Sequence, residues 1–272
     1  MGYLTTDKKK VTVKTLLEMK AAGEKITQMT AYDFTTAGII DAAGIDSILV
    51  GDSASNVMAG NQDTTPITID QMIYHARSVV RACQHCLVVC DMPFGSYQVS
   101  REEGIRNAIR VIKETGAGAL KMEGGKEIVD TVKGIVDAGI PVIGHLGLTP
   151  QSIHKFGGYG LRAKDEAEAE KLIEDALALD EAGVSAITLE KVPATLATKV
   201  TSMVKAATIG IGAGNGTDGQ VLVYADALGM TQGFKPKFLR HFANVNKCIT
   251  DGVQEYIKCV KDMSFPSEAE AY

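Results

Sequence analysis

Short apolar runs recur along the whole chain, and each is separated from the next by a stretch whose apolar residues repeat at helical spacing. Eight runs predict strands: Lys25–Ala31, Ser47–Gly51, Cys86–Asp91, Ala119–Glu123, Pro141–His145, Ser185–Glu190, Thr208–Gly212 and Val221–Ala225. Six stretches between them predict helices: Thr36–Ala43, Ile69–Ala82, Arg101–Thr115, Glu127–Ala138, Asp165–Ala182 and Thr195–Ala206. Strands that alternate with helices in this way pair in parallel through right-handed crossovers.

The number of predicted strands favours a closed (β/α)8 TIM barrel over an open, doubly wound sheet. The chain has 272 residues, close to the roughly 250 residues typical of one such barrel. A dinucleotide-binding open sheet would have a glycine-rich turn after its first strand, where MTAYDF stands instead. We therefore predict a single α/β barrel domain over residues 1–272.

Three further segments lie outside this alternation. Val13–Ala22 has the pattern of an extra helix, which we expect to close the bottom of the barrel. Phe238–Val260 predicts one or two helices, and the terminal SFPSEAEAY predicts a loose acidic tail.

Charge and composition exclude several classes of partner. The net charge of −5 is spread along the chain, so there is no basic stripe for nucleic acid. No apolar run approaches the ~20 residues that a membrane-spanning helix needs. Lys8–Lys10 precede an amphipathic segment rather than the apolar stretch of a signal peptide. We therefore expect a cytoplasmic protein without nucleic-acid or membrane partners.

Three of the five cysteines form a C-x2-C-x3-C pattern, namely Cys83, Cys86 and Cys90. This spacing is compatible with a metal site, but no matching cysteine or histidine pair follows at the spacing of zinc sites. Cys90 also lies within the apolar run CLVVCD. We therefore interpret these cysteines as reduced thiols of the core.

Charged and polar residues stand where the predicted strands two to six end. They are Asp52 and Ser53, Asp91, Lys121 and Glu123, His145, and Glu190. In a (β/α)8 barrel the C-terminal ends of the strands converge on one mouth, where the active sites of this fold lie. The pattern therefore predicts that these side chains meet in one site.

Strand four gives the clearest example of this arrangement. Side chains alternate across a strand, so Lys121 and Glu123 share one face. Leu120 and Met122 share the other face, which we expect the helices to cover. The two charges then point into the mouth, where they are costly unless they are paired or bound to a metal. A structural Lys121–Glu123 ion pair is the alternative to a ligand site.

Carboxylates at three successive strand ends favour a hard metal ion. Asp52, Asp91 and Glu123 offer oxygen ligands without a cysteine or histidine at motif spacing, which suits Mg²⁺ better than Zn²⁺. Mg²⁺ keeps several waters and uses about one or two carboxylates plus substrate oxygens. A 2-oxo acid could chelate it through its carboxylate and ketone, while Lys121 offsets the charge of the substrate carboxylate.

Such a chelate stabilises the enolate that forms when the carbon beside the ketone loses a proton. Glu190, at the end of strand six, is the candidate general base because it stands across the predicted mouth. His145 is either a competing base or a residue that orients the substrate or a neighbouring side chain.

These residues occur within a series of longer motifs. TAYD, LVGDS, DMPFGSY, KMEGG, GHLGLTPQS, FGGY, LE-x-VP, IGIGAG and DGQ-x-LV follow one another in this order. Together they resemble the ketopantoate hydroxymethyltransferase family, over nearly the whole chain from about Thr12 to Phe242. The resemblance implies a (β/α)8 barrel of the phosphoenolpyruvate/pyruvate type. It also implies Mg²⁺-dependent transfer of a hydroxymethyl group from 5,10-methylenetetrahydrofolate to 3-methyl-2-oxobutanoate, which gives 2-dehydropantoate in pantothenate (coenzyme A) biosynthesis.

The resemblance also implies roles for individual residues. The matching metal-site residues are Asp52, Asp91 and Glu123. The matching oxo-acid contacts are Ser53, Lys121 and the same two aspartates. Glu190 matches the proposed proton acceptor of the family. Family members assemble as homodecamers, so the resemblance implies an oligomer here.

Two loops depart from the family pattern. Gly60–Thr68 reads GNQDTTPIT where GHDSTLPVT is common, and Gly157–Lys164 reads GGYGLRAK where GGYKVQG is common. Both follow predicted strands, and we expect them to line or cover the mouth, so the folate contacts are not assigned. Lys191 replaces a small residue that often follows the catalytic glutamate. None of these departures touches the metal-site residues.

Two other interpretations share some of these features. A Mg²⁺-dependent 2-oxo acid lyase or phosphomutase on the same barrel would use the same metal and enolate chemistry. Such lyases usually carry a catalytic cysteine in a KKCGH-type loop, which this sequence lacks. A non-catalytic binding barrel would have to bury the strand-end charges without a ligand, at a cost in stability.

Overall fold

The computed structural model describes residues 10–233 and 235–272, and within them eight parallel strands close into a barrel in the order β1 to β8. Their bounds are β1 (Ile26–Thr30), β2 (Ser47–Val50), β3 (Leu87–Asp91), β4 (Ala119–Glu123), β5 (Val142–Gly147), β6 (Ala186–Glu190), β7 (Ala207–Ile211) and β8 (Gly219–Leu222). The barrel closes where β8 pairs with β1. The predicted (β/α)8 architecture is confirmed. Lys8 and Lys9, part of the predicted lysine-rich start, lie outside the described residues.

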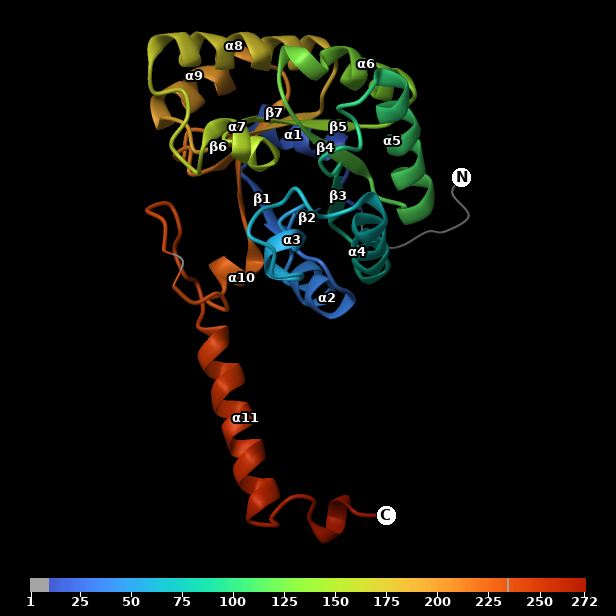
Figure 1. Cartoon of the computed structure of the whole chain (residues 1–272), viewed down its shortest axis with the longest axis vertical. Helices are drawn as coiled ribbons and strands as arrows, with labels where there is room; N and C mark the ends of the chain where they lie inside the picture. The colour runs from blue at the N-terminus through green and yellow to red at the C-terminus, as the bar shows by residue number, and fades with distance from the viewer. Residues whose placement is uncertain (1–9, 234) are drawn as a thin grey trace. The chain divides into compact units, whose positions relative to one another are not determined.

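Helices connect the successive strands from β1 to β7, and a loop joins β7 to β8 (Figure 1). Within the barrel unit they are α1 (Val13–Ala22), α2 (Phe34–Ala42), α3 (Ala54–Val57), α4 (Ile69–Ala82), α5 (Arg101–Thr115), α6 (Val129–Asp137), α7 (Ile153–Phe156), α8 (Glu166–Glu181) and α9 (Ala194–Met203), with the 3-10 turns η1 (Lys126–Ile128) and η2 (Pro150–Ser152). The helices α1, α4 and α5 have the predicted bounds. Local signals fix the ends of α5, because the Ser100 side chain caps its first turn and Gly116, with a φ of 75°, ends it.

The last strand differs from its prediction. The expected strand at Val221–Ala225 is wrong in its bounds, since β8 runs from Gly219 to Leu222 and Tyr224–Ala227 forms the short helix α10. The strand starts two residues before the predicted position because Gly219 pairs with Ile26 of β1 and Ile209 of β7. The backbones of Gly219 and Ile26 approach one another closely there. A Cβ at Gly219 would lie 2.5 Å from the Ile26 carbonyl oxygen, so only glycine fits there. The helices α3 and α7 were also not predicted, because four residues are too few to show a helical period.

The leading helix closes the bottom of the barrel, as predicted. Leu16 of α1 is fully buried in one apolar cluster with residues from the strands. Its strand partners are Ile26, Leu49, Leu87, Val89, Ala119, Ile143, Ala186, Ala207, Ile209 and Val221. Burial of one leucine side chain contributes about 2 kcal/mol to stability. The helix α1 therefore covers the bottom of the barrel core and stabilises it.

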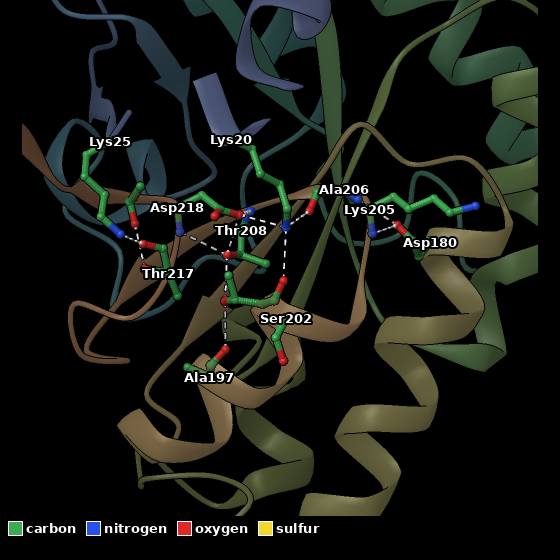
Figure 2. A network of polar contacts seen from close by, with 12 residues as sticks. Lys20, Lys25, Asp180, Ala197, Ser202, Lys205, Ala206, Thr208, Thr217 and Asp218 are labelled. Atoms are coloured by element: carbon green, nitrogen blue, oxygen red, sulfur yellow. Dashed lines mark hydrogen bonds and ion pairs between the residues drawn. The ribbon is translucent and has the colours of Figure 1, made fainter. Parts of the chain in front are cut away.

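A polar network fastens α1 to the starts of β7 and β8, and Figure 2 shows the Lys20 side chain reaching into it. The Lys20 ammonium donates to the Ala206 carbonyl oxygen at 2.9 Å and lies 3.0 Å from Asp218 Oδ2. The same Asp218 oxygen accepts the backbone amide of Thr208 at 2.8 Å. In these contacts each donor is therefore paired with an acceptor, and the Lys20 ammonium is paired with a carboxylate.

The chain divides into two compact units, of which the first ends at Val223 and the second is Tyr224–Tyr272. The second unit holds α10 (Tyr224–Ala227), α11 (Val245–Lys261) and the 3-10 turn η3 (Glu268–Glu270). The predicted helix at Phe238–Val260 begins later, at Val245, and the tail predicted to be loose contains η3. The expectation of one domain over residues 1–272 stays a prediction. No helix among the described residues is both long and apolar enough to cross a membrane.

Candidate active site

The polar side chains predicted at the strand ends lie together in the barrel mouth. Asp91, Glu123 and Glu190 end β3, β4 and β6, and Asp52 lies two residues beyond the end of β2. The parallel register sets Asp91 beside Lys121 and Glu123 beside His145. Five of these side chains have little solvent contact, with exposed fractions of 4% for Asp52, 2% for Asp91, 4% for Lys121, 6% for Glu123 and 3% for His145. The strands therefore bury a charged cluster.

Lys121 and His145 link the carboxylates of this cluster. The Lys121 ammonium lies 3.0 Å from Asp91 Oδ1 and 3.3 Å from His145 Nδ1. His145 Nδ1 lies 3.1 Å from Glu123 Oε1, and His145 Nε2 lies 3.4 Å from Glu190 Oε2. The structural Lys121–Glu123 pair that sequence alone left open is not the pairing found, because Lys121 pairs with Asp91 and Glu123 pairs with His145.

Negative charge is in excess in the mouth. Burial, and then the charges of Glu123 and Asp91, raise the pKa of Asp52 to about 8. Burial likewise raises the pKa of Asp91, although Lys121 opposes that shift. For His145, burial and Lys121 lower the pKa, but Glu123 and Glu190 outweigh them and raise it to about 9. The four carboxylates of the cluster therefore outnumber its two cationic side chains, Lys121 and His145.

The donor set fits a hard divalent cation. Asp91 Oδ1 and His145 Nε2 are buried atoms without a hydrogen-bond partner in the described part of the chain, although each lies near an opposite charge. Oxygen donors with surplus negative charge suit Mg²⁺. The carboxylate oxygens of Asp52, Asp91 and Glu123 do not all lie within 4.8 Å of one another, judged over the described residues. Three direct bonds to one ion would therefore require the side chains to move.

Gln151, which the sequence did not single out, ties the cluster together. Its side-chain amide donates to Asp52 Oδ2 and to the Met92 carbonyl oxygen, both at 2.9 Å. Its backbone amide donates to Glu123 Oε2 at 2.9 Å. The Tyr97 hydroxyl donates to Gln151 Oε1 at 2.8 Å and accepts from the Glu123 amide at 3.0 Å. Gln151 and Tyr97 therefore fix the positions of two predicted metal-site carboxylates.

Ser53 lies at the start of α3, directly after Asp52. Its hydroxyl is 2.7 Å from the hydroxyl of Tyr32, which follows β1 and is fully buried. Tyr32 is a second residue that sequence reasoning did not assign. Its only signal was the TAYD motif just beyond a strand end.

The backbone around Glu190 is tightly held. Its carbonyl oxygen accepts the Leu148 amide at 2.8 Å, and a Cβ at Gly147 would lie 2.3 Å from that same oxygen. The next residue, Lys191, has a φ of 46°, which is uncommon outside glycine and clusters at functional sites. The end of β5 and this strained residue together position the Glu190 side chain beside His145.

The two loops that depart from the family pattern both lie at this mouth. The Lys191 ammonium donates to the Tyr159 carbonyl oxygen, and the Lys191 carbonyl oxygen accepts the Arg162 amide at 2.8 Å. Burial, and then the charges of Asp63, Glu190 and Asp52, raise the pKa of Tyr159. His154 Nε2 of α7 lies 3.4 Å from Asp63 Oδ2, which links the first loop to the helix before the second. Lys191 therefore holds the second loop through both its side chain and its backbone.

A cavity of about 500 Å³ lies beside the mouth, between the segments that follow β4 and β5 and the start of α8. Glu123 and Gln151 line it, together with Phe94, Lys155, Phe156 and Arg162. The Arg162 guanidinium stacks 4.0 Å above the Phe156 ring. A molecule larger than an oxo acid could therefore reach the Glu123 side of the cluster from this cavity.

Comparisons with known proteins agree with the motifs. The family model described as ketopantoate hydroxymethyltransferase matches residues 10–268. A 3-methyl-2-oxobutanoate hydroxymethyltransferase from Bacteroides thetaiotaomicron is 59% identical over 271 residues, which cover 100% of this chain and 99% of that protein. The enzyme of the same name from Christiangramia forsetii is 58% identical over 272 residues, with 100% of both chains covered.

Solved structures support the fold. A phosphonopyruvate hydrolase in complex with oxalate and Mg²⁺ has a TM-score of 0.61 at 12% identity, with 95% of this chain and 92% of that chain covered. A 2,3-dimethylmalate lyase of the PEP mutase/isocitrate lyase superfamily has a TM-score of 0.60 at 15% identity, with 92% and 88% covered. The family match and the near-identical length of the relatives decide the assignment. The chain belongs to the ketopantoate hydroxymethyltransferase family.

Proposed function

We propose that this chain transfers a hydroxymethyl group from 5,10-methylenetetrahydrofolate to 3-methyl-2-oxobutanoate, with Mg²⁺ as the metal, and so forms 2-dehydropantoate for pantothenate synthesis. The observation that carries the proposal is the buried cluster in which Asp52, Asp91 and Glu123 surround two cationic side chains, Lys121 and His145, on a chain of this family. A buried excess of carboxylates is unfavourable without a cation. The cluster therefore favours a bound metal and an anionic, chelating substrate.

Asp52 and Asp91 are the proposed direct metal ligands. Asp91 Oδ1 is buried and pairs with the Lys121 ammonium at 3.0 Å, and a carboxylate oxygen in such a pair keeps a second lone pair for an ion. Glu123 is the third acidic residue, and its hydrogen bonds to His145 and Gln151 suit contact through a water. Bound Mg²⁺ would supply a Lewis acid at the ketone oxygen and favour loss of the neighbouring proton.

Lys121 and Ser53 are the proposed contacts to the oxo acid. The Lys121 ammonium is buried beside Asp91, where it can balance the charge of a substrate carboxylate that approaches the same ion. The Ser53 hydroxyl can donate to a substrate oxygen while it keeps its contact with Tyr32. These two residues bind and orient the substrate, and they take no proton.

Glu190 is the proposed general base, and His145 holds it in place. Glu190 is more exposed than the other carboxylates, with 17% of its side chain accessible, so it can meet a substrate that enters the mouth. His145 bridges Glu123 and Glu190, which suits the orienting role better than that of a competing base. Glu190 would take the proton from C3 of the oxo acid. The C3 atom then bonds to the folate methylene carbon as the first of its two carbon–nitrogen bonds breaks. Water then bonds to the same carbon as the second carbon–nitrogen bond breaks and so supplies the hydroxyl oxygen. The proton held by Glu190 and one proton of the water pass to the two folate nitrogens.

The proposal includes assembly as a homodecamer in the cytoplasm. An exposed apolar face of α11 supports assembly, because Ile249, Val253, Tyr256 and Ile257 are all exposed at helical spacing. Such a face is covered in most stable proteins by another surface. Light scattering on the purified protein should give a mass of about ten chains, and a monomeric mass would remove this part of the proposal.

Exchange of the C3 proton of 3-methyl-2-oxobutanoate into D₂O tests the chemistry most simply. We expect wild-type protein with Mg²⁺ to catalyse exchange without folate, because enolisation needs only the metal and Glu190. A chelator should stop the exchange, and Glu190→Gln should slow it by about 10³-fold. Net product should need the folate. Absence of exchange by the folded, Mg²⁺-loaded protein would disprove the mechanism, and product formed without folate would indicate a lyase-type activity instead.

A further inference from the structure

A second group of metal-ligating side chains lies at the opposite end of the barrel from the mouth. Asp41 comes from α2, whereas Cys83 ends α4 and Cys86 precedes β3. One carboxylate oxygen and the two sulfur atoms lie within 4.8 Å of one another. All three residues are buried, with exposed fractions of 4%, 5% and 0%. Sequence spacing missed this group because Asp41 comes from a separate helix, well before the two cysteines.

The geometry suits a small tetrahedral ion. Zinc–sulfur bonds of about 2.3 Å and zinc–oxygen bonds of about 2.0 Å set neighbouring ligand atoms roughly 3.5 Å apart. Side-chain adjustments of about 1 Å therefore bring the three atoms to bonding distance. The C-x2-C spacing of Cys83 and Cys86 is one that places two sulfurs on a single zinc ion.

Asp41 organises the loop that carries the two cysteines. Its carboxylate accepts the backbone amides of Gln84 at 2.8 Å, His85 at 3.2 Å and Cys86 at 2.8 Å. These bonds wrap the loop around the carboxylate, so both thiols approach it. The Asp41 carboxylate also accepts a hydrogen bond from the Cys86 thiol, and Asp41 Oδ2 lies 3.2 Å from Nδ1 of the His85 ring. A cation that displaces the Cys86 thiol proton would take this acceptor position of the carboxylate.

The Cys83 and Cys86 thiols share a hydrogen bond, so their sulfur atoms already lie side by side. Binding of a divalent ion displaces thiol protons and stabilises both thiolates. The His85 side chain, 32% exposed, leaves a route of entry from solvent.

We propose that Asp41, Cys83 and Cys86 form a structural site for one sulfur-preferring divalent cation of the Zn²⁺ class, with water at its fourth position. The bottom face of a (β/α)8 barrel serves stability rather than chemistry. Such an ion joins α2 to the connection between α4 and β3, two segments that Asp41 already links by hydrogen bonds. The site is independent of the mouth and of the proposed transfer reaction.

The test uses the full chain, reduced with a thiol-free phosphine and stripped with a chelator, then saturated with Mg²⁺ so that the mouth is occupied. Cd²⁺ is then added, because cadmium–thiolate bonds absorb in the near ultraviolet. We expect one equivalent of Cd²⁺ to bind with this absorption, and Zn²⁺ to compete for it. Zn²⁺ should also raise Tm by a few degrees, since the ion binds the folded state alone.

Variants assign the ligands. Cys83→Ser and Cys86→Ser should each weaken Zn²⁺ binding by at least about 100-fold. Cys248→Ser is the matched control, because it removes a thiol from the exposed face of α11 and should change nothing. A folded, reduced wild-type protein without the cadmium–thiolate absorption would overturn the proposal, and this outcome needs no variant. Equal Zn²⁺ binding by Cys83→Ser and by the control would overturn it too.

Discussion

The carboxylates at the bottom of this barrel and those at its mouth have different surroundings. At the bottom, Asp218 accepts the Thr208 amide and pairs with Lys20 (Figure 2). Asp46 accepts the Thr27 amide there at 2.8 Å. At the mouth, burial and neighbouring carboxylates raise the pKa values of Asp52 and Asp91, whereas His145 and Lys121 outweigh burial and lower the pKa of Glu123. The acids at both ends accept backbone amides, but the acids at the mouth are also buried beside other carboxylates.

This difference separates stability from function. A carboxylate that accepts backbone amides contributes to folding, because the charge is compensated in the folded chain itself. A buried carboxylate beside other carboxylates costs folding energy, and it is retained only where a ligand compensates it. Mutations at the bottom should consequently change Tm, and mutations at the mouth should change metal binding or turnover. Each of the following predictions tests that division.

Glu190→Gln should have the largest effect. Loss of the general base should lower kcat by about 10³-fold, or roughly 4 kcal/mol of transition-state stabilisation. Tm should stay within a degree or two of wild type, because Glu190 keeps a partly exposed position. Steady-state kinetics and a thermal melt on the same preparation measure both quantities. Normal turnover by the Mg²⁺-loaded variant would show that the base lies elsewhere.

Lys20→Met should lower the stability of the fold and leave kcat unchanged, the reverse of the effect expected for Glu190→Gln. The change removes the ammonium that bonds the Ala206 carbonyl oxygen and Asp218, and it leaves that half-buried carboxylate without its cation. We expect a loss of about 2–3 kcal/mol in the free energy of unfolding, measured by urea denaturation. The kcat of the folded enzyme should not change. Lys14→Met is the control, because Lys14 lies on the same helix with 83% of its side chain exposed.

Protonation of Asp41 should destabilise the fold within a defined range of pH. The pKa of Asp41 is lowered from 3.8 to about 2, because the amide hydrogen bonds of the cysteine loop outweigh desolvation. A lowered pKa stabilises the fold above the unfolded value and loses that contribution as pH falls toward the folded value. Asp41→Asn should therefore cost about 2 kcal/mol at neutral pH. The difference from wild type should shrink as pH falls from about 4 to about 2, as measured by denaturant melts. A difference that is constant with pH would contradict this account.

Gln151→Ala should have the smallest effect of the four. Its side-chain amide orients Asp52 without touching the ion itself, so Mg²⁺ affinity should fall by about 10-fold. Calorimetry with Mg²⁺ measures this change. Gln84→Ala is the control, because Gln84 lies in the bottom loop. Unchanged affinity in Gln151→Ala would mean that the orientation of Asp52 does not depend on this contact.

The sequence predicted most of the barrel because its signals were local. Strand β4 and helices α1, α4 and α5 have clear periodicity, and Thr68 and Ser100 mark the starts of α4 and α5. Strand β8 was misplaced because its start depends on pairing with Ile26, a contact that no local pattern shows. The location of the charged residues at the strand ends was predictable, because the C-terminal ends of all strands meet at one mouth in this fold.

Other parts of the site depend on tertiary contacts. Gln151 and Tyr97 lie within the motifs GHLGLTPQS and DMPFGSY, but no local pattern showed that these neutral residues would bridge Asp52 and Glu123. Asp41 lies inside a predicted helix, and only the folded chain brings it to Cys83. Sequence spacing finds ligands that are close along the chain, and it misses those that meet across two elements.

Titration of Mg²⁺ into Asp52→Asn, in the presence of 3-methyl-2-oxobutanoate, tests the central claim most directly. The account predicts that Mg²⁺ affinity falls by at least about 100-fold relative to wild type. It also predicts that the metal-free variant melts no lower than the metal-free wild type, because the change removes one of the crowded carboxylates. A folded variant that binds Mg²⁺ as tightly as wild type would contradict a metal held by the strand-end acids.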